Sequence, residues 1–213
     1  IRDSTSLEQK AIIEIARARD IYLFSDEMYH KLIIGDDVEL SPICDLYENG
    51  ISLWGTSKTF GLAGLRLGWL VSQDTDFLRR VLAYKDYLSI CSNAPGEVLS
   101  IIALNHLDEI VTPNILKIQS NVEVFATFAS EQACFGPFIR PRAGSVAFVP
   151  IHVEGSSQEF SDRLVQETGI MAVPGEMFGY DGKYIRIGFG RESLPETLQY
   201  LHEYLAVGIT AAQ

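Results

Sequence analysis

The sequence is poor in cysteine, poor in basic residues relative to acidic ones, and has no long apolar run. Its 213 residues include three cysteines, Cys44, Cys91 and Cys134, without the short spacings of metal sites or disulfide frameworks. They indicate reduced thiols in a cytoplasmic protein. The net charge of −11 repels nucleic-acid phosphates and anionic lipid headgroups, and no apolar run approaches the roughly 20 residues of a membrane-spanning helix. These absences disfavour a metal, nucleic-acid or membrane function.

What is present is an ordinary globular composition, with apolar runs and amphipathic stretches in alternation, which predicts an α/β fold. The pattern changes near Pro113 and predicts an α/β domain over residues 1–112 and a smaller α+β domain over 113–213. The expected strands cover residues 21–24, 51–54, 68–71, 146–150, 171–173 and 184–188. The expected helices cover residues 7–19, 76–88, 97–107, 115–129, 158–167 and 195–207.

An acidic cluster, Ser25-Asp26-Glu27-Met28-Tyr29, follows the first expected strand. That strand, residues 21–24, is a continuous apolar run, which is typical of a strand covered on both faces. Ligands of open α/β sheets bind at the carboxyl ends of the strands. Asp26 is therefore either the cap of a following helix or a ligand-binding carboxylate.

A glycine-rich segment with one lysine, residues 55–68, follows the second expected strand. Lys58 lies at the same edge of the sheet, where partial desolvation favours a neutral, nucleophilic amine. Ser57 and Arg66 flank it with a hydroxyl and a guanidinium, which are phosphate donors. The spacing fits neither a Walker phosphate loop nor a GxGxxG turn. An amine for an aldehyde, donors for a phosphate and a carboxylate for a ring nitrogen match pyridoxal phosphate.

Three motifs resemble the fold type I aminotransferases of class I and II, in their order and their spacing. They are Asp26-Glu27-Met28-Tyr29, then Ser57-Lys58-Thr59-Phe60-Gly61-Leu62-Ala63-Gly64-Leu65-Arg66-Leu67-Gly68, then Tyr184-Ile185-Arg186-Ile187-Gly188. The resemblance implies an α/β fold in which part of a large, mainly parallel sheet domain is followed by a smaller α+β domain. It also implies a pyridoxal-phosphate-dependent transferase, a homodimer, and an amino acid and a 2-oxo acid as substrates.

The resemblance implies a role for each matching residue. Lys58 would form the Schiff base with the cofactor and then move the α-proton of the substrate. Asp26 would pair with the ring nitrogen, and Tyr29 would donate a hydrogen bond to the ring oxygen. The cofactor phosphate would be held by Ser57 and Arg66. The substrate carboxylate would be bound by Arg186, bidentately where the geometry permits.

The chain departs from the family pattern at two places. Many relatives carry Ser or Thr three residues before the lysine as a phosphate ligand, where this chain has Gly55. Thr56 or water is expected to replace that contact. Relatives also carry some 150 or more residues before the strand that precedes Asp26, so the chain is expected to be the C-terminal part of the enzyme.

Two further functions stay open. The stretch from Lys85 to Pro95 resembles a branch that includes amino-acid-modifying enzymes such as capreomycidine synthase. A lyase, decarboxylase, cyclase or synthase of the same fold is therefore the alternative to amino-group transfer. The third hypothesis is a non-catalytic regulatory domain of this fold.

Overall fold

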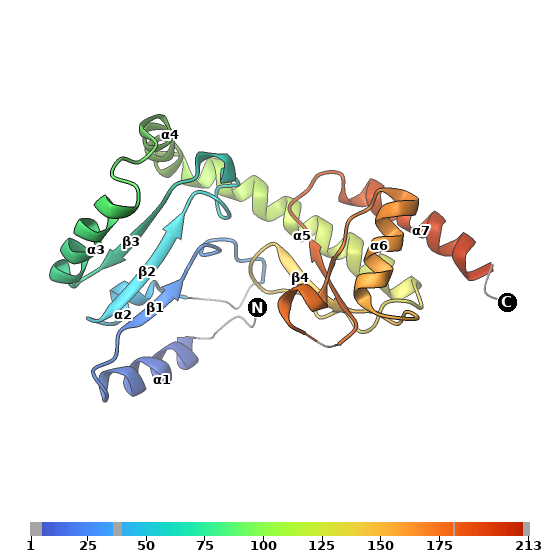
Figure 1. The fold of residues 1–213 in the computed structure, drawn as a ribbon, viewed down its shortest axis with the longest axis horizontal. Coiled ribbons are helices and arrows are strands. Elements are labelled where there is room, and N and C mark those ends of the chain that lie inside the picture. Colours follow the sequence, from blue (N-terminus) through green and yellow to red (C-terminus); the bar gives the residue numbers. More distant parts are fainter. Residues whose placement is uncertain (1–5, 36–39, 181, 211–213) are drawn as a thin grey trace. The chain divides into compact units, whose positions relative to one another are not determined.

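The computed structural model describes residues 6–35, 40–180 and 182–210, and the chain divides into two compact units (Figure 1). The first unit comprises Ile1–Ile115 with Arg142–Gly144, and the second comprises Leu116–Pro141 with Ser145–Gln213. Within the described ranges, no helix is both long and apolar enough to cross a membrane. The same ranges hold no cluster of three or more His, Cys, Asp or Glu side chains suited to a metal ion. The three cysteines are free.

The first unit is built on a three-stranded sheet. Its strands are β1 (Leu23–Asp26), β2 (Gly50–Gly55) and β3 (Gly68–Ser72), in the order β1-β2-β3. β1 and β2 are parallel, with Asp26 opposite Leu53, whereas β2 and β3 are antiparallel. Because β1 and β2 run the same way, their carboxyl ends meet at one edge of the sheet (Figure 1).

In the described part of this unit, four α-helices and the start of a fifth accompany the sheet. They are α1 (Ser6–Arg17), α2 (Ile43–Leu46), α3 (Thr75–Leu88), α4 (Ala94–Asn105) and the first residues of α5 (Leu107–Glu131). The capping side chains of Asp74 and Asn93 accept hydrogen bonds from the amides of Phe77 and Gly96, which starts α3 and α4. The sequence predicted α3 correctly apart from its first residue, placed α4 two to three residues too late at both ends, and missed the one-turn helix α2.

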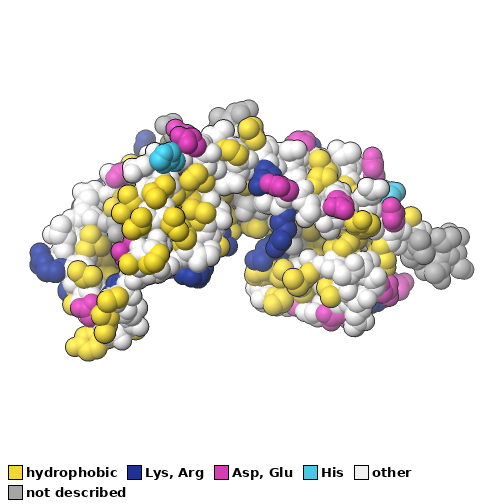
Figure 2. All heavy atoms as spheres, turned by 90° about the horizontal axis from the view of Figure 1, so that it is seen from above, with side chains coloured by type: hydrophobic (Ala, Val, Ile, Leu, Met, Phe, Trp, Pro, Cys, Tyr) yellow, Lys and Arg dark blue, Asp and Glu magenta, His cyan; other side chains and the backbone are white. Residues whose placement is uncertain are grey.

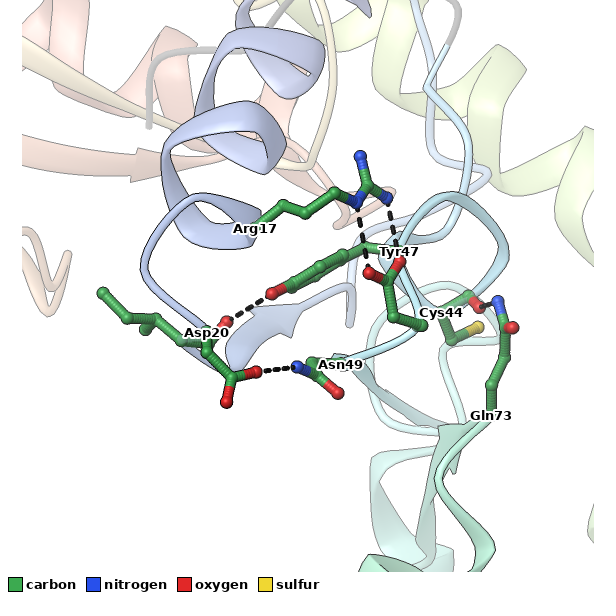
Figure 3. A network of polar contacts seen from close by, with 8 residues as sticks. Arg17, Asp20, Cys44, Tyr47, Asn49 and Gln73 are labelled. Carbon is green, nitrogen blue, oxygen red and sulfur yellow. Dashed lines mark hydrogen bonds and ion pairs between the residues drawn. The ribbon is translucent and has the colours of Figure 1, made fainter.

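Polar contacts join α1 and α2 to the ends of the strands (Figure 3). Arg17 pairs with Glu48 through two hydrogen bonds of 3.1 and 2.8 Å. The Tyr47 hydroxyl, in a residue only 1% exposed, donates to the Ile21 carbonyl at 2.8 Å. A further bond runs from the Asn49 amide to the Asp20 carboxylate. These contacts fix the segment that leads from α1 into β1.

The first strand differs from its prediction in register and in cover. It begins at Leu23, because the Ile21 amide bonds to the Ala16 carbonyl and Asp20 adopts a positive φ of 52°, so these residues complete the turn out of α1. Phe24 is 59% exposed. The prediction of a strand buried on both faces is therefore wrong for this structure, because exposed and half-buried residues alternate along β1 and the face that carries Phe24 is exposed.

The second unit holds a small antiparallel sheet and three long helices. The strands β4 (Val146–Pro150), β6 (Tyr184–Gly188) and β5 (Val173–Pro174) lie in that order. The helices are the remainder of α5, α6 (Ser157–Thr168) and α7 (Leu194–Thr210). Phe125 of α5 is fully buried, and its ring meets the edges or faces of four other phenylalanine rings at centroid distances of 5.0 to 6.2 Å. This aromatic cluster is the core of the unit.

Helix α5 is longer than the sequence predicted, because it continues through Pro113. A proline inside a helix removes one backbone donor and crowds the preceding turn, which is why the pattern placed the helix start at residue 115. The helix begins in the first unit and ends in the second. Asn121, 4% exposed, ties it to the segment after β6 by donating to the carbonyls of Phe189 and Arg191.

Glu27→Ala is expected to lower the free energy of unfolding by about 2–4 kcal/mol, because two partly buried donors lose their partner. One carboxylate oxygen of Glu27 accepts from the Ile43 amide and the other from the Trp54 indole, both at 2.8 Å. Urea denaturation measures the loss. Glu48→Ala is the matched control, since Glu48 also makes two bonds but is exposed. An equal loss of unfolding free energy in both variants would contradict the stabilising role of the Glu27 hydrogen bonds.

Candidate active site

The carboxyl ends of β1 and β2 bring four of the predicted site residues to one edge of the sheet. Asp26 is the last residue of β1, and Tyr29 lies in the turn that follows. Ser57 and Lys58 come directly after β2. Since β1 and β2 are hydrogen-bonded neighbours in parallel register, these side chains extend from adjacent strand ends.

The loop after β2 is anchored on both sides of Lys58. Thr56 is fully buried, Thr59 and Phe60 are each 2% exposed, and Lys58 between them is exposed. Its Nζ lies 6.0 Å from the centroid of the Tyr29 ring. The partial desolvation expected for Lys58 is therefore absent from this structure, because the side chain is exposed. The loop nevertheless presents a single amine next to a phenol.

Asp26 does not cap a helix. One oxygen of its exposed carboxylate accepts a hydrogen bond from the Met28 amide at 3.1 Å, which makes a local turn rather than a helix start. The next turn contains Tyr29, whose carbonyl accepts from the Leu32 amide at 3.0 Å. The capping interpretation of Asp26 is therefore wrong, and the ligand-binding interpretation stays a prediction.

Tyr29 is half-buried, and its ring lies against Gly144 of the same unit. Gly144 has a φ of +81°, and a Cβ there would lie 3.6 Å from Cδ1 of Tyr29. The Gly144 amide donates to the Leu32 carbonyl at 2.8 Å. The positive φ favours glycine at this position, where the backbone lies close to the tyrosine ring.

Arg66 ends a single 3₁₀ turn, η1 (Ala63–Leu65), in the left-handed conformation with φ +53°. This conformation is costly for a residue with a side chain and is found at functional sites. The exposed guanidinium donates to the Ala63 carbonyl at 3.1 Å. The neighbouring Leu65 carbonyl accepts from the Asn93 amide group at 3.3 Å, so the turn is attached to the start of α4.

Thr56 does not supply the hydroxyl that many relatives carry at the position of Gly55 as a phosphate ligand. The Thr56 hydroxyl is buried and is directed to the carbonyls of Leu62 and Leu67, each at 3.3 Å. A Cβ at Gly55 would lie 2.9 Å from the Leu67 oxygen and 2.9 Å from Cε of Met28. Glycine at this position therefore follows from the close approach of the chain between β2 and β3.

Arg186 belongs to the second unit and lies in the middle of β6. It pairs with Phe148 of β4 and with Val173 of β5, and its side chain is exposed. Its guanidinium carbon lies 5.2 Å from the centroid of the Phe178 ring, a cation–π contact. The aromatic ring restricts the guanidinium and leaves its N–H groups available for a planar anion such as a carboxylate.

His30→Gln is expected to remove a pH-dependent part of the stability of the first unit. The His30 ring lies 4.6 Å from the Trp54 ring, and burial lowers the pKa of His30 below its ordinary value of 6.5. The folded protein thus binds this proton more weakly than the unfolded chain does. The contribution of His30 is complete above about pH 6.5 and is lost as the pH falls through the lower folded pKa.

Melting temperatures of the wild type and of His30→Gln between pH 5 and 8 measure this effect. The difference between the two proteins should be constant above pH 6.5 and should shrink below it, because only the wild type then has to protonate a buried imidazole. A constant difference over the whole range would show that the pKa of His30 is the same in both states.

Two residues that organise this site, Glu27 and Thr59, were not predicted from the sequence. Glu27 links the end of β1 to Trp54 of β2 and to the start of α2. The Thr59 hydroxyl contacts the carbonyls of Met28 and His30. Glu27 belongs to the motif Asp26-Glu27-Met28-Tyr29, but its hydrogen-bond partners could not be predicted, because they lie 16 and 27 residues away in the chain.

The fold is that of the fold type I pyridoxal-phosphate-dependent enzymes. A PLP-dependent aminotransferase from Streptococcus suis superposes with a TM-score of 0.86 and 31% sequence identity, over 95% of this chain and 53% of that one. The PLP-dependent cyclase OrfR superposes with a TM-score of 0.82 at 22% identity, over 95% of this chain and 55% of its own. At that identity the likeness to OrfR shows the fold alone.

The chain belongs to the family "Aminotransferase class I and II", whose model matches residues 3–205. Capreomycidine synthase of Streptomyces vinaceus is 31% identical over 198 residues, which cover 91% of this chain and 50% of the synthase. Aspartate aminotransferase of Thermococcus kodakarensis is 24% identical, over 93% of this chain and 51% of its own. The chain therefore spans about half the length of these relatives.

Proposed function

We propose that this chain is part of a pyridoxal-phosphate-dependent aminotransferase that moves an amino group between an amino acid and a 2-oxo acid. The observation that carries the proposal is the exposed Lys58, anchored by buried neighbours and lying over Tyr29 beside the end of β1. Membership of the aminotransferase family supports the same chemistry.

The donor set of the first unit fits the cofactor group by group. Lys58 offers an amine for the aldehyde, Asp26 a carboxylate for the ring nitrogen, and Tyr29 a phenol for the ring oxygen. Ser57 and Arg66 offer a hydroxyl and a guanidinium for the phosphate. The pyridoxal ring, when bound, accepts electrons from the bonds at the α-carbon of the substrate. Each of these five assignments is part of the proposal.

Two residues act on the substrate in this proposal. Lys58 would hold the cofactor through its amine and would also serve as the base for the α-proton of the substrate, because it lies over Tyr29 beside the end of β1. Arg186 binds the α-carboxylate through the N–H groups that its contact with Phe178 leaves available. Holding the carboxylate orients the α-carbon and restricts the bonds that can react.

A second candidate function is supported by the 31% identity to capreomycidine synthase. A lyase, decarboxylase, cyclase or synthase would use the same lysine and the same carboxylate, since the bond that breaks depends on how the substrate is oriented. The residues of the first unit do not separate this function from amino-group transfer. Product analysis does.

The test uses the natural full-length protein that carries this chain, with pyridoxal phosphate and a panel of amino acids. Transfer predicts that an amino acid alone converts the bound cofactor to its amine form and releases one equivalent of 2-oxo acid. Added 2-oxoglutarate should then yield glutamate and restore the original absorbance. A cyclised, decarboxylated or eliminated product without glutamate would contradict transfer and support the second candidate.

We propose further that the protein is a cytoplasmic homodimer. Helix α4 buries only small residues, Gly96, Ser100 and Ala103, and exposes a row of aliphatic ones. Figure 2 shows apolar side chains gathered on this face of the first unit, and a second copy of the protein would exclude water from them. Light scattering of the full-length protein should give twice the monomer mass, and cell fractionation tests the compartment.

A further inference from the structure

Thr59, the residue after Lys58, connects the lysine loop to the turn that carries Tyr29. Its side chain is 2% exposed, and its hydroxyl lies 2.6 Å from the His30 carbonyl and 3.1 Å from the Met28 carbonyl. A hydroxyl has one proton to donate, so the shorter contact to His30 is the principal bond and the longer one shares the same proton. Both distances lie in the range of real hydrogen bonds.

The two carbonyls stand on either side of Tyr29 in the chain. A single buried hydroxyl therefore fixes the backbone both before and after the tyrosine. The Tyr29 ring itself lies against Gly144, whose amide donates to the Leu32 carbonyl. The turn is held from two directions, and the support from Thr59 comes from the residue next to the reactive amine.

We propose that Thr59 is a positioning residue that keeps the Tyr29 phenol and the Lys58 amine in one fixed arrangement. The inference rests on the function proposed above, because it assigns a purpose to the 6.0 Å contact between Lys58 and the Tyr29 ring. Without the hydroxyl, the turn of residues 28–30 loses its attachment to the lysine loop. The phenol then spends less time where it can donate to the ring oxygen of the cofactor.

The chemistry of threonine provides matched variants. Thr59→Val keeps the shape of the side chain and removes the hydroxyl, whereas Thr59→Ser keeps the hydroxyl and removes a methyl group. Thr59→Ala removes both the hydroxyl and the methyl group, and it replaces Thr59→Val in the experiment if the valine methyl is not tolerated beside the carbonyls. Tyr29→Phe removes the phenol directly, so the double variant Thr59→Val/Tyr29→Phe shows whether Thr59 acts through Tyr29.

Three quantities are measured on the natural full-length protein: the dissociation constant of pyridoxal phosphate, the pH midpoint of the visible absorbance band of the bound cofactor, and the melting temperature without cofactor. We expect Thr59→Val to weaken cofactor binding about tenfold and to move the pH midpoint in the same direction as Tyr29→Phe. Thr59→Ser should behave as the wild type. In the Tyr29→Phe background the valine substitution should change binding less than about twofold.

The proposal fails if Thr59→Val lowers only the melting temperature and leaves the affinity and the pH midpoint unchanged, because Thr59 is then a packing residue. It also fails if the effects of Thr59→Val and Tyr29→Phe multiply, because Thr59 then acts independently of the phenol. A wild-type protein that binds no pyridoxal phosphate would overturn the proposed function itself, and the positioning role with it. These outcomes are distinguishable, since the first two require a wild type that binds the cofactor.

Discussion

Lys58→Ala is expected to abolish covalent attachment of pyridoxal phosphate and to reduce turnover of the natural full-length protein by at least about 10⁴-fold. The substitution removes the reactive nitrogen but leaves the buried side chains of Thr56, Thr59 and Phe60, which anchor the loop. Because Lys58 is exposed, the free energy of unfolding should change by less than about 0.5 kcal/mol. Loss of activity without loss of stability is the expected signature of a reactive residue.

Borohydride treatment followed by peptide mass analysis measures the attachment, since it reduces a carbon–nitrogen double bond to a stable single bond. The added mass should be found on the peptide that contains Lys58 in the wild type and on no peptide of the variant. Lys31→Ala is the matched control, because Lys31 is an exposed lysine of the same unit, close in the chain to Tyr29. If the label remained in Lys58→Ala, another lysine would hold the cofactor.

The sequence was sufficient to predict which of the candidate residues follow the ends of β1 and β2. The apolar run that becomes β2 and the lysine after it place Lys58 at the edge of the sheet, and the parallel pairing of β1 with β2 adds Asp26. This information is local, because the position of a residue just after a strand follows from the strand. Local patterns likewise predicted the bounds of β4 and β6 correctly.

The contacts that hold the site together were not predictable, because they join residues distant in the chain. Thr59 contacts carbonyls 29 and 31 positions earlier in the chain. Every residue has a backbone carbonyl, so the sequence does not indicate which of them accepts the bond. The cover of a strand is a similar case. The apolar residues 21–24 form a pattern typical of a central strand, yet the exposure of their side chains depends on which elements pack against β1.

The second large effect is expected from Asp26→Asn, which should reduce turnover by about 10²–10³-fold with little change in melting temperature. The Asp26 carboxylate accepts from the Met28 amide at 3.1 Å, and the side-chain oxygen of asparagine can accept the same bond. The local turn is therefore retained, whereas the negative charge is lost. The variant isolates the charge that the proposed function assigns to the protonated ring nitrogen.

Steady-state kinetics and the dissociation constant of pyridoxal phosphate measure this effect together. A charge that stabilises the electron-accepting form of the ring should lower kcat more than it weakens cofactor binding, because its contribution is largest when negative charge develops at the α-carbon. Asp76→Asn is the control for a general charge effect, since Asp76 is an exposed carboxylate of α3 that forms an ion pair with Arg79. Its turnover should stay within about twofold of the wild type. If Asp26→Asn kept normal turnover with the turn intact, the carboxylate at the end of β1 would have no part in the chemistry, and the ring nitrogen would need a different partner.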